Sequence, residues 1–188
     1  MKRTNKVVVL FARHDSVYKN LVTDVYDLDR NALTYKGERP VIAHPPCRAW
    51  GQLRHFAKPL PGEKDLALWS IELIRKNGGV LEHPRASKLW PQYLPYPGHY
   101  DEFGGFTISI DQHWFGHKAK KSTFLYFCGC TLNDLPKIPI SLNPPTHTIS
   151  SVKPKHSLRK PEVSKKWREA TPLTLALWLI EAAKLCKK

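Results

Sequence analysis

The stretch PGEKDLALWSIELIRKNGGVLEHP, residues 61–84, joins the clearest predicted helix of the chain to a short apolar strand. Glu63 and Asp65 suit the positive end of a helix dipole, and Asn77-Gly78-Gly79 is a helix stop signal. The strand GGVLEHP, residues 78–84, follows at once and ends at a proline. The apolar residues expected on the buried face of the helix are Leu66, Trp69, Leu73 and Ile74.

Another short apolar run, RPVIAHPPC at residues 39–47, precedes the helix and stops at two prolines that cannot donate to a sheet ladder. Strand, helix and strand in this order predict a βαβ unit, in which the two strands are parallel neighbours. The carboxyl ends of such strands share one edge of the sheet, where ligands bind in open α/β folds. We therefore expect a site where these two strands end.

The remaining pattern extends this unit into an α/β protein. We predict a single Rossmann-like domain over residues 1–188, with a mostly parallel sheet flanked by helices and an irregular basic, proline-containing segment at 133–170. The final helix, TPLTLALWLIEAAKLCKK, is expected to have Thr171 as its N-cap and Pro172 at its first position. Further strands are predicted at 6–12, 24–29, 106–114 and 122–129, and a surface loop at 91–105.

The charge balance indicates an anionic partner. Lysine and arginine total 30 against 16 acidic residues, a formal net charge of +14, which favours nucleic acid and above all DNA. The alternative is that the excess of positive charge serves only the general solubility of the protein. The sequence shows no secretory signal. No apolar run approaches the length of about 20 residues that a helix needs to span a bilayer, so no membrane partner is expected. The four cysteines are interpreted as reduced thiols of a cytoplasmic protein.

Cys47 is the first candidate for chemistry. A thiol reacts as its thiolate, and neighbouring positive charge favours that form. Arg48, Arg54, His55 and Lys58 follow Cys47 closely, and the two prolines before it restrict the loop. We interpret Cys47 as a nucleophile; the alternative is a structural thiol beside a turn.

Glu82 and His83 form the second cluster, at the end of the strand after the helix. A carboxyl group there is expected to be desolvated, which raises its pKa and suits it to donate a proton. The alternative is a glutamate paired with one of the many cations.

The third cluster is QHWFGHKAKKSTFLYF, residues 112–127, in which cations surround two aromatic residues. Such a mixture suits a phosphate backbone and an unstacked base, although it also fits a solvated charge run. Its cations are His113, His117, Lys118, Lys120 and Lys121. A zinc set of Cys128 and Cys130 with His113 or His117 is a weaker interpretation, because a C-x-C pair lacks the spacing of a zinc finger, and no metal is expected. The chain has neither a G-x-G-x-x-G motif nor a P-loop.

The order of these clusters is similar to that of a known family. HPPC, then LEHP, then QHWFGHKAKKSTFLYFCG and finally REATP before the last helix resemble the cytosine-5 DNA methyltransferases, especially their short, divergent phage-type members. The resemblance covers about residues 40–130 and the final helix. It implies that Cys47 attacks C6 of a flipped cytosine, that Glu82 stabilises N3, and that Gln112 matches the glutamine of the family's Gln-x-Arg-x-Arg segment.

Further site residues follow from the clusters and the resemblance together. His83, which replaces the family's usual asparagine, joins Cys47 and Glu82 as a catalytic candidate. Trp50, Phe56, Trp114 and Phe115 are candidates for stacking on the base. The residues expected to contact the base or the DNA are His44, Pro46, Arg48, Trp50, Arg54, His55, Gln112, His113, His117, Lys118 and Lys121.

The cofactor region departs from the family. The resemblance implies S-adenosylmethionine, held by Phe11 and by Asp27 or Asp29, but the family's Phe-x-Gly-x-Gly loop is replaced by FARHDSVYKN at residues 11–20, which has no glycine. An arginine expected at His113 and the large target-recognition insert are also missing. Three interpretations remain: a small methyltransferase with an unusual cofactor loop, an enzyme that acts on a pyrimidine base or nucleotide without this cofactor, and a non-catalytic DNA-binding protein with a relict site.

Overall fold

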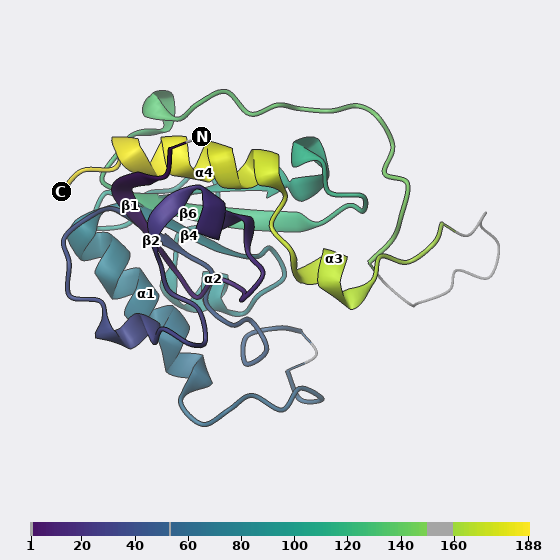
Figure 1. Cartoon of the computed structure of the whole chain (residues 1–188), viewed down its shortest axis with the longest axis horizontal. Helices are drawn as coiled ribbons and strands as arrows, with labels where there is room; N and C mark the ends of the chain where they lie inside the picture. Colours follow the sequence, from purple (N-terminus) through teal and green to yellow (C-terminus); the bar gives the residue numbers. More distant parts are fainter. Residues whose placement is uncertain (1, 53, 150–159) are drawn as a thin grey trace.

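The computed structural model describes residues 2–52, 54–149 and 160–188, which are arranged around a six-stranded sheet (Figure 1). The strands are β1 (Thr4–Leu10), β2 (Val22–Val25), β3 (Val41–Ala43), β4 (Gly79–Pro84), β5 (Phe106–Asp111) and β6 (Ser122–Cys128). The helices are α1 (Glu63–Asn77), α2 (Leu89–Tyr93), α3 (Lys165–Glu169) and α4 (Leu173–Leu185), with short 3-10 helices η1 (Val17–Asn20), η2 (Ala32–Thr34), η3 (Gln112–Phe115) and η4 (Leu132–Asp134).

The sheet has the order β2-β1-β3-β4-β6-β5. Strands β2, β1, β3 and β4 are parallel, and β6 runs antiparallel to both of its neighbours, β4 and β5. The predicted α/β class with a mostly parallel sheet flanked by helices is confirmed. The chain passes from β1 to β2 on one side and then to β3 on the other, so the strand order reverses between β1 and β3, which is where ligands of such sheets usually bind.

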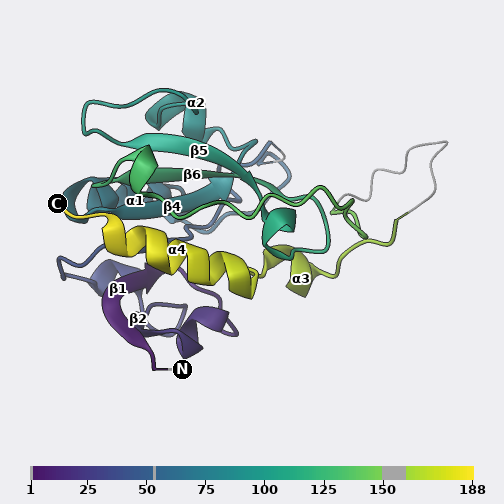
Figure 2. The ribbon, with the colours of Figure 1, turned by 90° about the horizontal axis from the view of Figure 1, so that it is seen from above.

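Both faces of the central strands are buried, which explains why these strands are almost wholly apolar. Figure 2 shows α4 lying along the sheet, where it packs on Val9, Ile42 and Val80. The alternate positions of the same strands, such as Val41 and Leu81, pack on α1 across the other face. A side chain of β3 or β4 therefore belongs to the α4 face or the α1 face according to its parity along the strand.

Helix α1 has the predicted bounds but not the predicted buried face. Ala67, Ile71 and Ile74 are buried, whereas Leu66, Trp69 and Leu73 are only half-buried. The small side chain of Ala67 lets the helix lie close to the sheet, and the larger residues pack around the edges of that contact. The periodicity identified the helix correctly, but size rather than hydropathy decided which face is innermost.

Several predicted boundaries are wrong by a few residues. Strand β1 ends at Leu10 rather than residue 12, because the chain turns at Phe11, a non-glycine residue with φ of 60°. Strand β2 begins and ends earlier than the predicted 24–29. Strand β5 ends at Asp111, whose side chain accepts the His113 N–H and so begins η3 inside the predicted strand 106–114.

The C-terminal part differs from prediction in similar ways. Helix α4 begins at Leu173 with Pro172 as its N-cap, so Thr171 lies outside the helix. The predicted loop at 91–105 begins inside α2, and the predicted irregular segment at 133–170 contains α3. Residues 150–159 of that segment lie outside the described residues. Among the helices of the described ranges, each is too short or too polar to cross a bilayer.

Candidate active site

Strands β3 and β4 place His44 and Glu82 side by side. Ile42 of β3 pairs with Val80 of β4, and His44 and Glu82 each lie two positions further along the chain. The parity of the strands therefore puts both side chains on the α4 face, at the carboxyl edge of the sheet. The backbone N–H of His44 also donates to the carbonyl of Leu10, which ties this edge to the end of β1.

A continuous hydrogen-bonded chain links these side chains to two other elements. His44 Nδ1 lies 3.0 Å from Glu82 Oε2, and His44 Nε2 lies 3.2 Å from the hydroxyl of Tyr18 in η1. On the other side, Gln112 Nε2 of η3 donates to Glu82 Oε1 at 3.0 Å. The carboxylate of Glu82 is therefore held by one partner at each oxygen.

Gln112 completes the arrangement and leaves one acceptor free. Its side-chain amide is buried, with 1% of the residue exposed, and also donates to Thr123 Oγ1 at 3.0 Å. Its own oxygen has no hydrogen-bond partner among the described residues. A buried acceptor without a donor costs about 1–3 kcal/mol.

Glu82 is an anion in this arrangement. Burial raises the pKa of its carboxyl group, but the hydrogen bond from His44 and the charge of Lys121 outweigh burial and hold the pKa at about 2. The predicted raised pKa is therefore wrong, because the sequence did not show that His44 would reach the carboxylate. Since a carboxylate only accepts hydrogen bonds, Nδ1 of His44 must carry the shared hydrogen.

Trp50 anchors the loop that carries Cys47 to helix α1. The carbonyl of Cys47 accepts the N–H groups of Trp50 and Gly51, at 3.0 and 2.9 Å. The indole of Trp50 donates to the carbonyl of Lys64 in α1 at 3.1 Å. Because Trp50 is 1% exposed, the structure does not support its predicted contact with a base; it holds the Cys47 loop instead.

Cys47 lies at the surface, and its thiol is protonated at rest. Partial burial and the negative charge of Glu82 raise the pKa of this thiol, and Lys121 opposes them. The expectation that following cations would lower this pKa is wrong, because Arg48 is paired with the buried Glu63. The loop that carries Cys47 follows β3, which pairs with β4, the strand of Glu82.

His83 faces away from this site. It follows Glu82 in the strand and so lies on the α1 face, fully buried at the edge of the Trp90 ring. Neither ring nitrogen makes a hydrogen bond within the described residues. Burial lowers the pKa of His83 to about 4, partly opposed by the charge of Glu82 and by the nearby Pro46 carbonyl. His83 is therefore a neutral packing residue, which does not support its predicted catalytic role.

The histidines of the 112–121 cluster serve the fold. The ring nitrogens of His113 lie 2.8 Å from the His117 carbonyl and 2.7 Å from the Asn143 carbonyl. The buried His117 ring contacts the carbonyls of Ala119 and Trp167. These contacts tie the irregular segment and α3 to the sheet, so a direct DNA contact by His117 is not supported.

The lysines of the cluster divide between two roles. The Lys118 ammonium lies over the ring of Trp167 in α3, 4.5 Å from its centroid. The Lys121 ammonium instead acts on Glu82 and Cys47, and it lowers the pKa of each. Lys121 is thus the cation of this cluster that the structure brings to the candidate site.

The other predicted contact residues lie around the loop after Cys47. Pro46 and Arg54 are half-buried, whereas His55 and Phe56 are exposed. Of the predicted stacking residues, Phe115 is buried against Trp178 at 5.7 Å between ring centroids. Phe56, which is 86% exposed, is the one most available to a ligand.

The residues assigned to S-adenosylmethionine do not fit that role as they stand. Asp27 Oδ2 lies 2.5 Å from Lys19 Nζ, and Oδ1 accepts the N–H groups of Asp29 and Arg30, so neither oxygen is free for a ribose. Asp29 is exposed on the surface. Phe11 packs edge-on against Trp69, at 6.1 Å between ring centroids. No step of the reaction proposed below uses this cofactor.

Two groups of side chains contain possible metal ligands. Within the described residues, His14, Asp27 and Asp29 converge, but Lys19 already neutralises Asp27. The predicted weaker set at Cys128 and Cys130 is not assembled. Cys130 Sγ lies 3.1 Å from Cys186 Sγ, Cys128 Sγ contacts the Phe103 carbonyl, and both candidate histidines contact backbone carbonyls.

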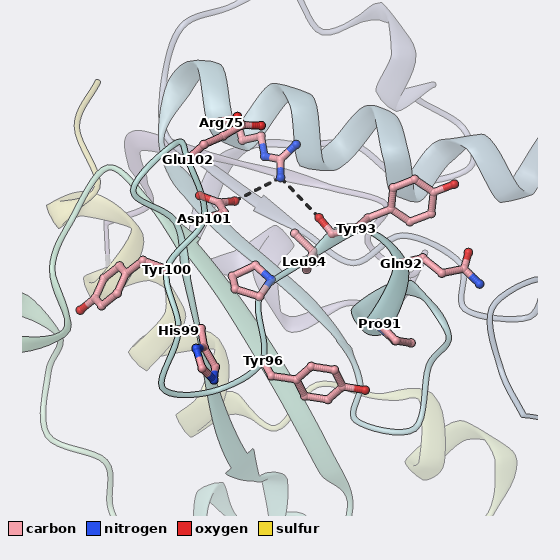
Figure 3. A pocket seen from close by; sticks show the side chains of 11 residues that line it. Arg75, Pro91, Gln92, Tyr93, Leu94, Tyr96, His99, Tyr100, Asp101 and Glu102 are labelled. Atoms are coloured by element: carbon pink, nitrogen blue, oxygen red, sulfur yellow. Dashed lines mark hydrogen bonds and ion pairs between the residues drawn. The ribbon is translucent and has the colours of Figure 1, made fainter.

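A surface hollow of about 580 Å³ lies elsewhere, beside α2 and the end of α1 (Figure 3). In its lining, Arg75 lies 3.1 Å from Asp101, and the exposed Glu102 is a further acidic residue. It is lined by none of the residues singled out in the sequence.

Tyr18 and Thr123 belong to the site but were missed in the sequence. Tyr18 lies in FARHDSVYKN, a stretch that stood out only because it lacks glycine. Ser16, which caps η1 by accepting the Tyr18 N–H, is the local signal that a short helix follows β1. Nothing in the sequence indicates that its tyrosine meets His44.

Comparison with known proteins adds no assignment. No model of a known protein family matches the chain, and no curated protein does. The similarity to the cytosine-5 DNA methyltransferases therefore rests on the short motifs quoted above.

Proposed function

We propose that this protein modifies cytosine in DNA through covalent addition of Cys47 to C6 of the base. The observation that carries the proposal is the joint position of Cys47 and Glu82. Cys47 follows β3, and Glu82 lies near the end of β4, the parallel strand beside it. Both lie next to the point where the strand order reverses. Glu82 acts electrostatically on Cys47, and Lys121 acts on both. A nucleophile, a carboxylate and a cation thus share one edge of the sheet.

This set of groups is chemically coherent. A thiolate that adds to C6 moves electrons through the ring toward N3 and makes C5 nucleophilic. A carboxyl group at N3 offsets the charge that develops there. Gln112 Nε2 donates to Glu82 Oε1 and so helps to fix the orientation of this carboxylate at the edge of the sheet.

The positive charge of the chain supports a polymeric substrate. A net charge of +14 favours the phosphate backbone, and Lys121 adds a cation at the site itself. The base must leave the duplex to reach a thiol, at a cost of a few kcal/mol. Phe56 is an exposed ring close in sequence to Cys47 on which an extruded base would stack.

The direct test is hydrogen exchange at C5. Reversible addition at C6 lets C5 take up a deuteron from the solvent, and elimination then returns a cytosine labelled at C5. We expect the protein to catalyse this exchange on a DNA oligonucleotide in heavy water, measured by mass spectrometry of the released nucleosides. The assay requires no knowledge of the group that is finally transferred.

Two parallel arms decide the substrate. An oligonucleotide without cytosine serves as the blank, and free deoxycytidine monophosphate replaces the DNA in a second arm. Exchange with the nucleotide alone would move the proposal to an enzyme of free nucleotides. Absence of exchange in both arms would reject C6 addition altogether.

The alternative function is DNA binding without catalysis, which the net charge favours. In that case affinity for DNA should fall at least about tenfold between about 50 and 200 mM salt, because binding releases counterions from the phosphates. Fluorescence anisotropy with a labelled duplex measures this dependence. Cys47→Ala should then leave both affinity and salt dependence unchanged.

A separate observation decides between these functions. Salt-dependent binding together with no C5 exchange supports the binding protein alone. Affinity that does not respond to salt contradicts it, because the proposed contacts are with phosphates.

A further inference from the structure

The protonation state of Glu82 poses a problem for the proposed reaction. A carboxylate with a pKa of about 2 is an acceptor at neutral pH and has no proton to give to N3 of a base. The electrons that reach N3 after addition at C6 nevertheless require a proton there. Another group must therefore supply it.

We propose that His44 stores this proton and passes it to the base through Glu82. The inference rests on the proposed function and adds a residue to it. His44 Nδ1 is 3.0 Å from Glu82 Oε2, within direct transfer distance, while Glu82 Oε1 lies on the side of Gln112. His44 reaches the base only through Glu82, so it is a positioning residue that also supplies the proton.

The surroundings of His44 suit a proton store that does not leak. The side chain is half-buried, and its Nε2 lies 3.2 Å from the hydroxyl of the buried Tyr18. Burial raises the pKa of Tyr18 well above its ordinary value, and the charge of Glu82 adds to this, so the phenol keeps its own proton. The relay therefore ends at His44 on this side.

The step balances without an outside reactant. The Cys47 thiol gives its proton to water, and the thiolate forms a bond to C6. The C5–C6 π pair moves to C4–C5, and the C4–N3 π pair becomes a lone pair on N3. Imidazolium His44 gives its Nδ1 proton to the Glu82 carboxylate and ends as neutral imidazole protonated at Nε2, and the lone pair on N3 then takes that proton from the Glu82 carboxyl group. Elimination runs the same transfers backward.

This scheme predicts a particular pH dependence. The reaction needs the thiolate of Cys47, and burial and the charge of Glu82 raise the pKa of this thiol, so the exchange rate of the wild-type protein should rise as the pH increases toward that pKa. The groups that face His44 are Tyr18 from η1 and Glu82 from β4. Lys121 and Cys47 interact with Glu82 from the segment before β6 and from the loop.

His44→Asn is the decisive variant. An asparagine amide at this position keeps an N–H donor for Glu82 but does not carry an additional proton. We expect the C5 exchange rate to fall about 10²–10⁴-fold. His44→Gln, whose amide reaches toward Tyr18, should behave in the same way.

Controls separate this proposal from the function on which it rests. His99→Asn, an exposed histidine in the hollow of Figure 3, should keep the wild-type profile, and thermal unfolding checks that each variant is folded. Exchange that depends on Cys47 but survives unchanged in His44→Asn overturns the His44 proposal alone. Absence of exchange in the wild-type protein removes both proposals.

Discussion

Replacing Cys47 with serine is expected to lower C5 hydrogen exchange to the uncatalysed background. A serine hydroxyl ionises far less readily than a thiol and is a much weaker nucleophile toward C6. Cys47 is exposed, and its loop is held through the backbone carbonyl of Cys47 and through Trp50. The midpoint of thermal unfolding should therefore stay close to that of the wild-type protein.

The matched control for this variant is Cys130→Ser. Cys130 is also partly accessible, but it contacts Cys186 and has no part in the candidate site. Its exchange rate should equal the wild-type rate. An active Cys47→Ser variant, or equal loss in both variants, would contradict the role of Cys47 as nucleophile.

Gly79→Ala is expected to destabilise the fold by about 4 kcal/mol or more, and so to abolish activity as well. An added Cβ would lie 2.1 Å from the Val41 carbonyl oxygen and 2.6 Å from the Val41 nitrogen. These are backbone atoms of the adjacent strand, which pairs Val41 with Gly79, and they have no room to move. The φ of 132° at Gly79 adds strain for any other residue.

Urea unfolding followed by circular dichroism measures this effect. Gly98→Ala is the matched control, since Gly98 also has a positive φ, of 93°, but an added Cβ there meets nothing within 4 Å. That variant should lose only about 1–2 kcal/mol from backbone strain. If the two variants unfold at similar urea concentrations, the close approach of β3 and β4 at Gly79 is not what constrains this position.

The fold was largely predictable because its signals are local. The helix 63–77 and the short apolar runs beside it specify a βαβ unit by periodicity and stop signals alone. From that unit alone, strand parity and direction place residues near 44 and 82 at one edge of the sheet. The errors fall at element ends, such as Phe11 and Asp111, where a single turn or cap decides the boundary.

The candidate site was predictable only in part. Cys47 and Glu82 were found because they end strands that the sequence identifies. The pKa directions of both groups were wrong, because they depend on partners far apart in the chain: His44 and Lys121 for Glu82, and Glu82 for Cys47. The pairing of Arg48 with Glu63, which withdraws a neighbouring cation from Cys47, is likewise a tertiary event.

The sequence by itself determined the α/β class, the order of the motifs and the strand ends at which Cys47 and Glu82 lie, since periodicity and chain direction are properties of local segments. The tertiary structure alone decided that His83 turns into the core, that His117 and Trp50 brace the fold, and that Tyr18 and Gln112 meet the His44–Glu82 pair. The physical reason is that hydrogen bonds and desolvation act through space. Tyr18 in η1, His44 after β3, Glu82 in β4 and Gln112 in η3 are far apart in the chain. They meet only in the folded protein.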